Sequence, residues 1–315
     1  MPIAIIDAHR ELESVARTFL EKTGARAEAR TLLDATDEQL PSFWKEIASL
    51  GWLGLHIPED FGGVGYGLPE LVVVIQEMGR AVAPGPFLPT VMSSALIVRT
   101  AAKEQQAELL PSLADGSTTA ALGWTNSLTL DGNVLSGDGG LVLGGNLADL
   151  FVLTAGDDVV IVDRDQLEIR VPGQFDATRR SVFVKANDVT VDEDRIIRGA
   201  APAAIDVARA LASAEASGIA QECVEKATEY AKVREQFGRV IATFQAVKHH
   251  CANMLVSSEL ATASTWDAAR ASENDPEQFR LAAAVAATES IPAVLINSQL
   301  NIQVHGGIGF TWEHD

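Results

Sequence analysis

Cysteine, basic side chains and long apolar runs are all scarce in this sequence. The two cysteines, Cys223 and Cys251, offer neither a disulfide framework nor a metal-ligand spacing. Only 24 Lys and Arg face 43 Asp and Glu, and the net charge of −19 disfavours nucleic acids and anionic membranes. Runs such as Leu71–Ile75 are far below a membrane span, and Ile3–Ile6 is too short for a signal-peptide core. We therefore expect a cytoplasmic protein with no metal, nucleic-acid or membrane partner.

The first third of the chain has the apolar spacing of helices. Hydrophobic residues make up 47% of the sequence, enough to bury a large core. From about residue 5 to residue 113 their spacing is helical, with breaks at Pro41, Pro58–Gly65 and Pro84–Pro86. This part is predicted to be a helical domain.

From about Gly116 to Arg198 the pattern changes to short apolar runs between turn residues. Leu150–Leu153 and Val159–Val162 have the length and composition of strands. The glycines at positions 137, 139, 140, 144 and 145 predict β turns, since they fit neither a dinucleotide-binding loop nor a P-loop. We expect a small β domain here.

The last third returns to long, alanine-rich helical periodicity. It predicts helices over about residues 202–234, 244–272 and 276–304, and Pro202 and Pro276 suit the first turns of two of them. The order is helical, then β, then helical, without repeating strand–helix–strand units. This order argues against a Rossmann architecture.

Four short motifs follow one another along these zones. They are Ile57–Gly63 with a Pro-Glu-x-x-Gly-Gly turn, Asp176–Arg179 reading Asp-x-Thr-Arg, Arg234–Gly238 reading Arg-Glu-Gln-Phe-Gly, and Gln303–Phe310 reading Gln-Val-His-Gly-Gly-Ile-Gly-Phe. In this order the motifs resemble the acyl-CoA dehydrogenase family. Within it, the chain resembles the short subunits of the heteromeric (α2β2) steroid-type acyl-CoA dehydrogenases of actinobacteria.

The resemblance implies an α+β fold with three domains. These are an N-terminal α-helical domain at residues 1–115, a middle β barrel at 116–200 and a C-terminal helical bundle at 201–315, which in the family packs into tetramers. The bundle would lack its usual last helix, because the sequence stops at Asp315. A fragment, or the front part of a fused two-copy protein, therefore stays open.

The resemblance also implies an FAD site shared between subunits. In the family these motifs contact the ADP half of an FAD whose flavin lies largely in a neighbouring subunit. An arginine can bind a pyrophosphate bidentately, and glycines let backbone N–H groups approach it closely. The alternative is that Arg234 caps one helix and Gly306 only ends another. The expected contacts, called the ADP half-site below, are Arg234, Gln236, Phe237, Gln245, Gln303, Gly306 and Gly307.

The family's catalytic base is missing from its two usual places. Desaturation needs a carboxylate that removes the α-proton. One branch places it just before a common arginine, where this sequence has Ala208 before Arg209. The other branch places it in a segment that would follow Asp315. Asp206 and Arg209 match family positions near bound CoA. They could equally form only a charge pair near the start of their helix, and the sequence leaves both roles open. Glu215, about 10 Å along the helix, is expected to be an interior polar residue.

The flavin-facing loops of the family are also altered. The usual Thr-Glu-Pro-x-x-Gly-Ser-Asp loop corresponds to Gly123–Thr129, and the usual Trp-Ile-Thr-Asn element corresponds to Leu141–Asn146. Both segments lack the family pattern, so this chain is not expected to hold a flavin ring by itself.

The resemblance therefore implies a subunit of an FAD-dependent acyl-CoA dehydrogenase that is active as a heterotetramer. It would lend its ADP half-site to a full-length catalytic subunit that desaturates a CoA thioester and passes electrons to an electron-transferring flavoprotein. The resemblance to the steroid-type enzymes implies a steroid-derived thioester. Two alternatives remain: a structural or CoA-binding protein without redox function, and a self-sufficient homotetrameric dehydrogenase with an unusual base.

Overall fold

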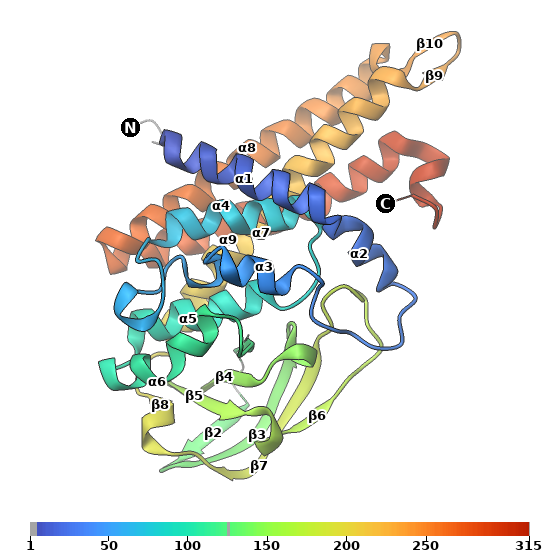
Figure 1. Ribbon diagram of the computed structural model, residues 1–315. Helices are drawn as coiled ribbons and strands as arrows, with labels where there is room; N and C mark the ends of the chain where they lie inside the picture. Colours follow the sequence, from blue (N-terminus) through green and yellow to red (C-terminus); the bar gives the residue numbers. More distant parts are fainter. Residues whose placement is uncertain (1–4, 125–126, 315) are drawn as a thin grey trace. The chain divides into compact units, whose positions relative to one another are not determined.

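The computed structural model describes residues 5–124 and 127–314, and its elements follow the predicted order (Figure 1). The N-terminal part is helical, and two of its breaks are short 3-10 turns, η1 (Trp52–Gly54) and η2 (Glu59–Phe61). The predicted breaks at Pro41, at residues 58–65 and at residues 84–86 are confirmed. The helices of this part are α1 (Asp7–Thr23), α2 (Ala25–Thr31), α3 (Trp44–Ser49), α4 (Leu68–Ala81), α5 (Phe87–Thr100) and α6 (Lys103–Ala114).

The Pro-Glu-x-x-Gly-Gly motif is a turn whose last two positions, Gly62 and Gly63, require glycine. Gly62 has a φ of 82°, in the left-handed region that other residues rarely adopt. A Cβ at Gly63 would lie 2.0 Å from the carbonyl oxygen of Ile57. The motif is therefore explained by backbone geometry, and it contributes to the fold whether or not a ligand binds.

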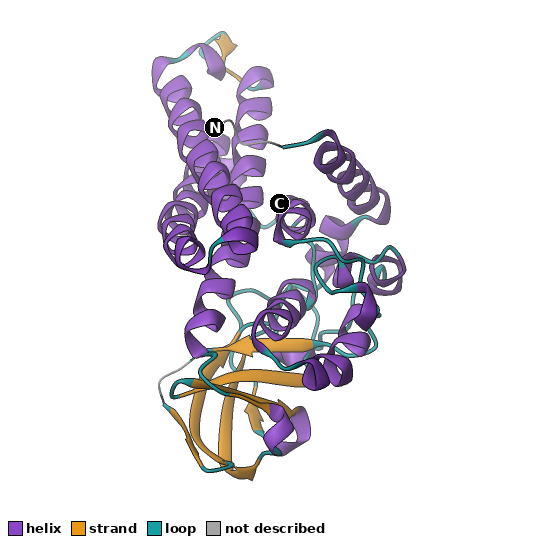
Figure 2. Cartoon of the chain, turned by 90° about the vertical axis from the view of Figure 1, so that its left-hand side faces the viewer, coloured by secondary structure: helices purple, strands orange, loops and turns teal. Residues whose placement is uncertain are grey.

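The middle part is a β domain with two four-stranded sheets around one core (Figure 2). The strand orders are β1-β4-β5-β8 and β2-β3-β7-β6, and β1 runs parallel to β4 while the other pairs are antiparallel. Phe151 of one sheet and Val182 of the other are both fully buried in that core. The strands are β1 (Ala120–Gly123), β2 (Leu128–Asp131), β3 (Val134–Val142), β4 (Leu150–Ala155), β5 (Asp158–Asp163), β6 (Glu168–Arg170), β7 (Val182–Thr190) and β8 (Ile196–Ile197).

The turn predicted at glycines 137, 139 and 140 is wrong. All three lie inside strand β3, whose pairing with β7 shifts register between Leu135 and Gly137 and again between Asp138 and Gly140. A Cβ at Gly137 would lie 2.3 Å from the carbonyl oxygen of Ser127. Glycines in a strand often mark such bulges and close backbone approaches. The prediction holds at Gly144, which has a φ of 67° and precedes a 3-10 turn, η3 (Gly145–Leu147).

The C-terminal part consists of three long helices, α7 (Ala201–Val233), α8 (Gln245–Asn274) and α9 (Pro276–His305). Their bounds agree with the predicted helices to within two residues. Between α7 and α8 lie the β9–β10 hairpin (Glu235–Gln236, Arg239–Val240) and a 3-10 turn, η6 (Ile241–Thr243), and α9 is followed by η7 (Gly306–Phe310). The side chain of Asp275 caps α9 by accepting hydrogen bonds from the backbone N–H groups of residues 277 and 278.

The chain folds as two compact units. One contains the described parts of Met1–Glu21, Val72–Val82 and Arg209–Asp315, and the other contains Lys22–Leu71 and Ala83–Ala208. The units follow packing, and the three-domain division at residues 115 and 200 stays a prediction. In the first unit, α4 and α7 cross closely, and the side-chain amide of Gln76 donates a hydrogen bond to Ser217 at 2.9 Å.

A buried ion network holds α1, α4 and α7 together in the same unit. Arg80 is buried and lies 3.1 Å from a carboxylate oxygen of Glu222, and it also bonds both carboxylate oxygens of Glu225. Arg17 of α1 donates two hydrogen bonds to Glu77 of α4, at 2.9 and 3.0 Å. Charges that leave water need such partners, so the network fixes how these helices pack.

The segment Glu277–Phe310 is long and apolar enough, by length and composition, to cross a membrane. In the structure this segment is mostly α9, which lies along α8 (Figure 1). Its buried Asn297 donates hydrogen bonds to the carbonyl oxygens of Ala220 in α7 and Met254 in α8. These bonds tie α9 into a helical bundle, the arrangement predicted for this part of the chain.

Candidate functional site

Two motifs that are almost 70 residues apart in sequence meet at one end of the C-terminal bundle. Tyr230, in the last turn of α7, stacks on His305, the last residue of α9, with ring centroids 4.3 Å apart and planes 25° apart. Below the rings, Ala231, Met254 and Val304 pack in one apolar cluster formed by α7, α8 and α9. The fold thus brings Arg234, after α7, to the same bundle end as Gly306, after α9.

Arg234 is presented to solvent by a well-defined backbone. Its N–H donates to the carbonyl oxygen of Tyr230 at 2.9 Å, and its own carbonyl oxygen accepts from Ile241 at 2.8 Å. The side chain is exposed and makes no hydrogen bond or ion pair with the residues that the structure describes. An exposed guanidinium with no such protein partner is free to bind an anion.

The neighbouring residues of the β9–β10 hairpin are exposed as well. Gln236 pairs with Arg239 in the hairpin, and its side chain donates to the carbonyl oxygen of Glu235 at 2.8 Å. Phe237 is 92% exposed, has a φ of 54° and meets Phe244 edge to face at 6.1 Å between centroids. Exposed aromatic rings and left-handed backbone at non-glycine residues are both uncommon, and they concentrate at functional sites.

The glycines after α9 leave open space beside the backbone. Gly306 has a φ of 65° and a ψ of −135°, and its N–H bonds back to the carbonyl oxygens of Gln303 and Ile302. A Cβ added at Gly306 or at Gly307 would meet no atom within 4 Å. Packing inside the chain therefore does not require glycine at Gly307, and a ligand could approach its backbone closely.

This end of the bundle is basic although the protein is acidic. Residues 230–250 contain Lys232, Arg234, Arg239 and Lys248 but one acidic residue, Glu235, against a net charge of −19 for the whole chain. Gln245 is the first residue of α8, whose N-terminus adds the positive end of a 30-residue helix. The bundle end therefore fits an anionic group such as a pyrophosphate.

Residues around the expected base position lie on α7 but face different directions. Ala208 is buried, whereas Arg209 is exposed. Asp206 is also buried, and it lies two residues before Ala208, about 200° around the helix. Burial lowers the pKa of the Arg99 guanidinium and the charge of Asp206 opposes that shift, so these two groups interact. Asp206 therefore has a structural partner and is not directed as a base at the Ala208 position.

The segment 141–146, which replaces one of the flavin-facing elements, is held by contacts to the N-terminal helical part and to the loop before β7. Asn146 donates from its side chain to Glu38 at 3.0 Å, and its backbone N–H bonds the carbonyl oxygen of Arg180. A Cβ at Gly144 would lie 2.6 Å from Cγ of Pro89. The segment 141–146 is thus held by its own subunit. In the segment 123–129, residues 125 and 126 lie outside the described residues, and Trp124 is half-exposed.

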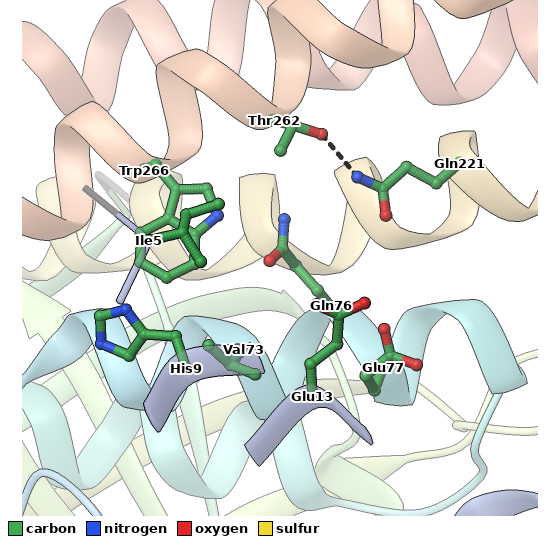
Figure 3. Close-up of a pocket in the computed structure, with 9 residues that line it drawn as sticks. All are labelled: Ile5, His9, Glu13, Val73, Gln76, Glu77, Gln221, Thr262 and Trp266. Carbon is green, nitrogen blue, oxygen red and sulfur yellow. Dashed lines mark hydrogen bonds between the residues drawn. The ribbon is translucent and has the colours of Figure 1, made fainter. Parts of the chain in front are cut away.

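A polar cavity of about 80 Å³, which was not predicted from the sequence, lies between α1, α4, α7 and α8 (Figure 3). The rings of His9 and Trp266 form one wall, 5.1 Å apart, and Gln221 donates to Thr262 on the opposite side. Two carboxylates also line it, Glu13 and Glu77, and both pair with Arg17. Because both carboxylates pair with Arg17, this cavity resembles a hydrated interior more than a reaction site. The polar pair Gln76 and Glu77, which directly follows the apolar run Leu71–Ile75, is the sequence signal that could have revealed it.

Comparison with known proteins agrees with this arrangement. Residues 6–117 match the N-terminal domain of acyl-CoA dehydrogenases, and residues 199–315 match the C-terminal domain. The chain is 34% identical to acyl-CoA dehydrogenase FadE34 of Mycobacterium tuberculosis, covering 98% of this chain but 43% of FadE34. It is 32% identical to acyl-CoA dehydrogenase IpdE2 of the same organism, covering 96% of this chain and 87% of IpdE2. The chain thus spans less than half the length of one of these relatives and most of the other.

Solved structures share the fold over nearly the whole chain. The steroid acyl-CoA dehydrogenase Tcur3481-Tcur3483 has a TM-score of 0.89 at 28% identity, covering 98% of this chain and 89% of that one. The ChsE4-ChsE5 complex of Mycobacterium tuberculosis has a TM-score of 0.93 at 22% identity, covering 100% of this chain and 90% of that one. The predicted architecture and the predicted resemblance to the steroid-type enzymes are confirmed.

Proposed function

Because this chain belongs to the acyl-CoA dehydrogenase family, a family of FAD-dependent oxidoreductases, we propose that it is a non-catalytic subunit of such an enzyme. In this proposal it completes the FAD site of a full-length catalytic partner subunit, which desaturates a CoA thioester between the α and β carbons. Two observations support the proposal: the Tyr230–His305 stack brings the segments that carry Arg234 and Gly306 to one bundle end, and a buried alanine, Ala208, stands at the expected base position.

The proposed division of labour follows from the side chains available. Arg234 would bind the pyrophosphate of FAD, and the backbone at Gly306 and Gly307 would approach it closely. FAD, when bound, supplies the acceptor for the hydride that leaves the β carbon. The proton at the α carbon needs a carboxylate in a dry cleft, and an alanine methyl cannot take it. The base would therefore come from the partner subunit.

Exposed apolar side chains on α8 and α9 support an obligate partner. On α9, residues Leu281, Val285, Ile291, Leu295 and Ile296 are each between 44% and 60% exposed, opposite a face buried against α8. On α8, Leu255, Val256 and Leu260 are exposed to a similar degree. Soluble monomers rarely expose apolar surface of this extent, whereas subunit interfaces bury it. We propose that these faces pack against helices of the catalytic subunit.

The proposed substrate class rests on similarity. The structure at 28% identity is described as a steroid acyl-CoA dehydrogenase, and on that basis we propose a steroid-derived CoA thioester. An electron-transferring flavoprotein is proposed as the electron acceptor, as in the family. Asp206 and Arg209 are the candidate contacts to CoA, and Arg209 is the better placed of the two because it is exposed.

The function can be tested with one substitution and a charge-matched control. In the complex co-expressed with the full-length dehydrogenase of a neighbouring gene, Arg234→Ala should lower FAD retention at least tenfold, the scale of one lost charge-assisted hydrogen-bond pair. Lys248→Ala removes the same charge from the same basic segment and should leave FAD retention nearly unchanged. The amount of FAD that stays bound through gel filtration is the measurement.

Equal FAD retention in Arg234→Ala and in the unmodified complex would refute the half-site. It would favour a structural or CoA-binding protein without redox function instead. Equal losses in both variants would mean that the bundle end attracts anions only through its general positive charge.

A further inference from the structure

Tyr230 and His305 are not among the expected FAD contacts, yet they are connected to both halves of the ADP half-site. Tyr230 accepts, at its carbonyl oxygen, the hydrogen bond from the N–H of Arg234. His305 is followed directly by Gly306. The stacked rings, 4.3 Å apart, are thus one contact that links the backbone of the arginine half to the backbone of the glycine half.

The ring of His305 is held in place by further contacts. It is 7% exposed, and its Nδ1 lies 2.8 Å from the carbonyl oxygen of Asn301. Because a carbonyl oxygen can only accept, this bond places the proton on Nδ1. The ring of His314 also meets the ring of His305 edge to face, at 4.7 Å between centroids. The ring orientation is therefore determined before any ligand binds.

We propose that the Tyr230–His305 stack is a positioning contact for FAD, and this inference rests on the function proposed above. The stack sets the spacing between Arg234 and the glycine backbone, so that one rigid surface meets both ends of the pyrophosphate. Without the stack, the final turns of α7 and α9 would be held at this end by the apolar cluster that contains Ala231, Met254 and Val304, with no ring contact between the two helices. Helix termini fray when their last turns lack packing partners.

A purely structural role would make a different prediction. If the stack only stabilised the bundle, any comparable loss of packing nearby would weaken FAD binding as much. Val304 provides the comparison, because it precedes His305 directly, is also 7% exposed and packs in the apolar cluster below the rings. Val304→Ala removes packing from this bundle end but leaves both rings in place.

The experiment is an FAD titration of the apo complex with the catalytic subunit, followed by flavin fluorescence, together with the melting temperature of each apo variant. His305→Ala should raise the FAD dissociation constant about threefold to tenfold, the scale of one lost aromatic pair. His305→Phe keeps a ring over Tyr230 and should restore affinity to within about twofold. Val304→Ala should lower the melting temperature yet leave the dissociation constant unchanged.

A double variant provides an independent check. Tyr230→Leu should weaken FAD as His305→Ala does, and combining the two should add little, since both remove the same contact. Additive losses would overturn the proposal, and so would an increase of the dissociation constant in Val304→Ala that equals the one in His305→Ala. Arg234→Ala, titrated in parallel, separates the half-site from the positioning role of the stack. If Arg234→Ala binds FAD weakly while His305→Ala binds it normally, only the positioning role is overturned. Normal binding in both variants overturns the half-site itself.

Discussion

A Cβ at Gly218 of α7 would lie 2.0 Å from the carbonyl oxygen of Gln76 in α4. The contact is reciprocal, since a Cβ at Gly79 of α4 would lie 2.5 Å from the carbonyl oxygen of Glu215 in α7. Two glycines thus let the backbones of these helices approach each other closely. Between them, Gln76 bonds Ser217 across the crossing.

Gly218→Ala is expected to destabilise the protein because the added Cβ would meet the backbone oxygen of Gln76, which cannot move aside without shifting helix α4. Overpacking of this kind costs about 1–3 kcal/mol, more than the helix propensity gained from alanine. The melting temperature of the complex should fall by several degrees. Gly173→Ala is the matched control, since a Cβ there would meet nothing within 4 Å and the change should be neutral. An unchanged melting temperature in Gly218→Ala would show that α4 and α7 do not cross so closely.

Ala208→Glu should not create a working base. The side chain would start from a buried position, where burial raises the pKa of a carboxyl group and unfolding becomes easier. The segment 141–146 is moreover held by Glu38 and Pro89, so restoring one carboxylate would not restore the flavin-facing surface. We expect Ala208→Glu and Ala208→Gln to show the same background turnover of acyl-CoA with a dye acceptor. Turnover that appears in the glutamate variant alone would show that this subunit can hold a flavin of its own.

His56 makes the stability of the second unit sensitive to acid. Burial lowers the pKa of its imidazole from 6.5 to about 3, and its Nε2 lies 2.9 Å from the Ser94 hydroxyl. Because the folded pKa is the lower one, the unfolded chain takes up a proton first as the pH falls below 6.5. The contribution of His56 to the free energy of unfolding should therefore decrease as the pH falls from 6.5 to about 3, by at most about 1.4 kcal/mol per pH unit. Above pH 6.5 this contribution should not change with pH.

His56→Gln tests this effect, since the amide nitrogen of glutamine can replace Nε2 beside Ser94 but does not titrate. Chemical unfolding at pH 7 and pH 5 should show a smaller loss of stability in the variant than in the unmodified protein. His249→Gln, at an exposed position, should behave like the unmodified protein. If His56→Gln loses as much stability between the two pH values, another group is responsible for the acid sensitivity.

The helices could be predicted because their signals are local. Pro202 and Pro276 mark the first turns of α7 and α9. The helical spacing of apolar residues in α9 continues to the glycines that follow it. The glycines of β3 were misinterpreted because a bulge and a turn have the same sequence signal. The difference is tertiary: it depends on how β3 pairs with β7 and on the carbonyl oxygen of Ser127 beside Gly137.

The site was predictable residue by residue but not as an arrangement. Motif resemblance pointed to Arg234 and to Gly306, yet nothing in the sequence shows that Tyr230 and His305 stack between them. The structural role of Asn146, which bonds Glu38 more than 100 residues away, was equally hidden. Contacts between distant segments depend on packing, and single motifs do not encode it.

If FAD is shared between this chain and a catalytic partner, the ratio of FAD to chains differs between the isolated chain and the complex. The visible spectrum and protein concentration should be measured for the chain expressed alone and for the chain co-expressed with the full-length dehydrogenase of a neighbouring gene. We expect little FAD in the first sample and about one FAD for every two chains in the second. About one FAD per chain in the protein expressed alone, with dehydrogenase activity, would contradict the shared site.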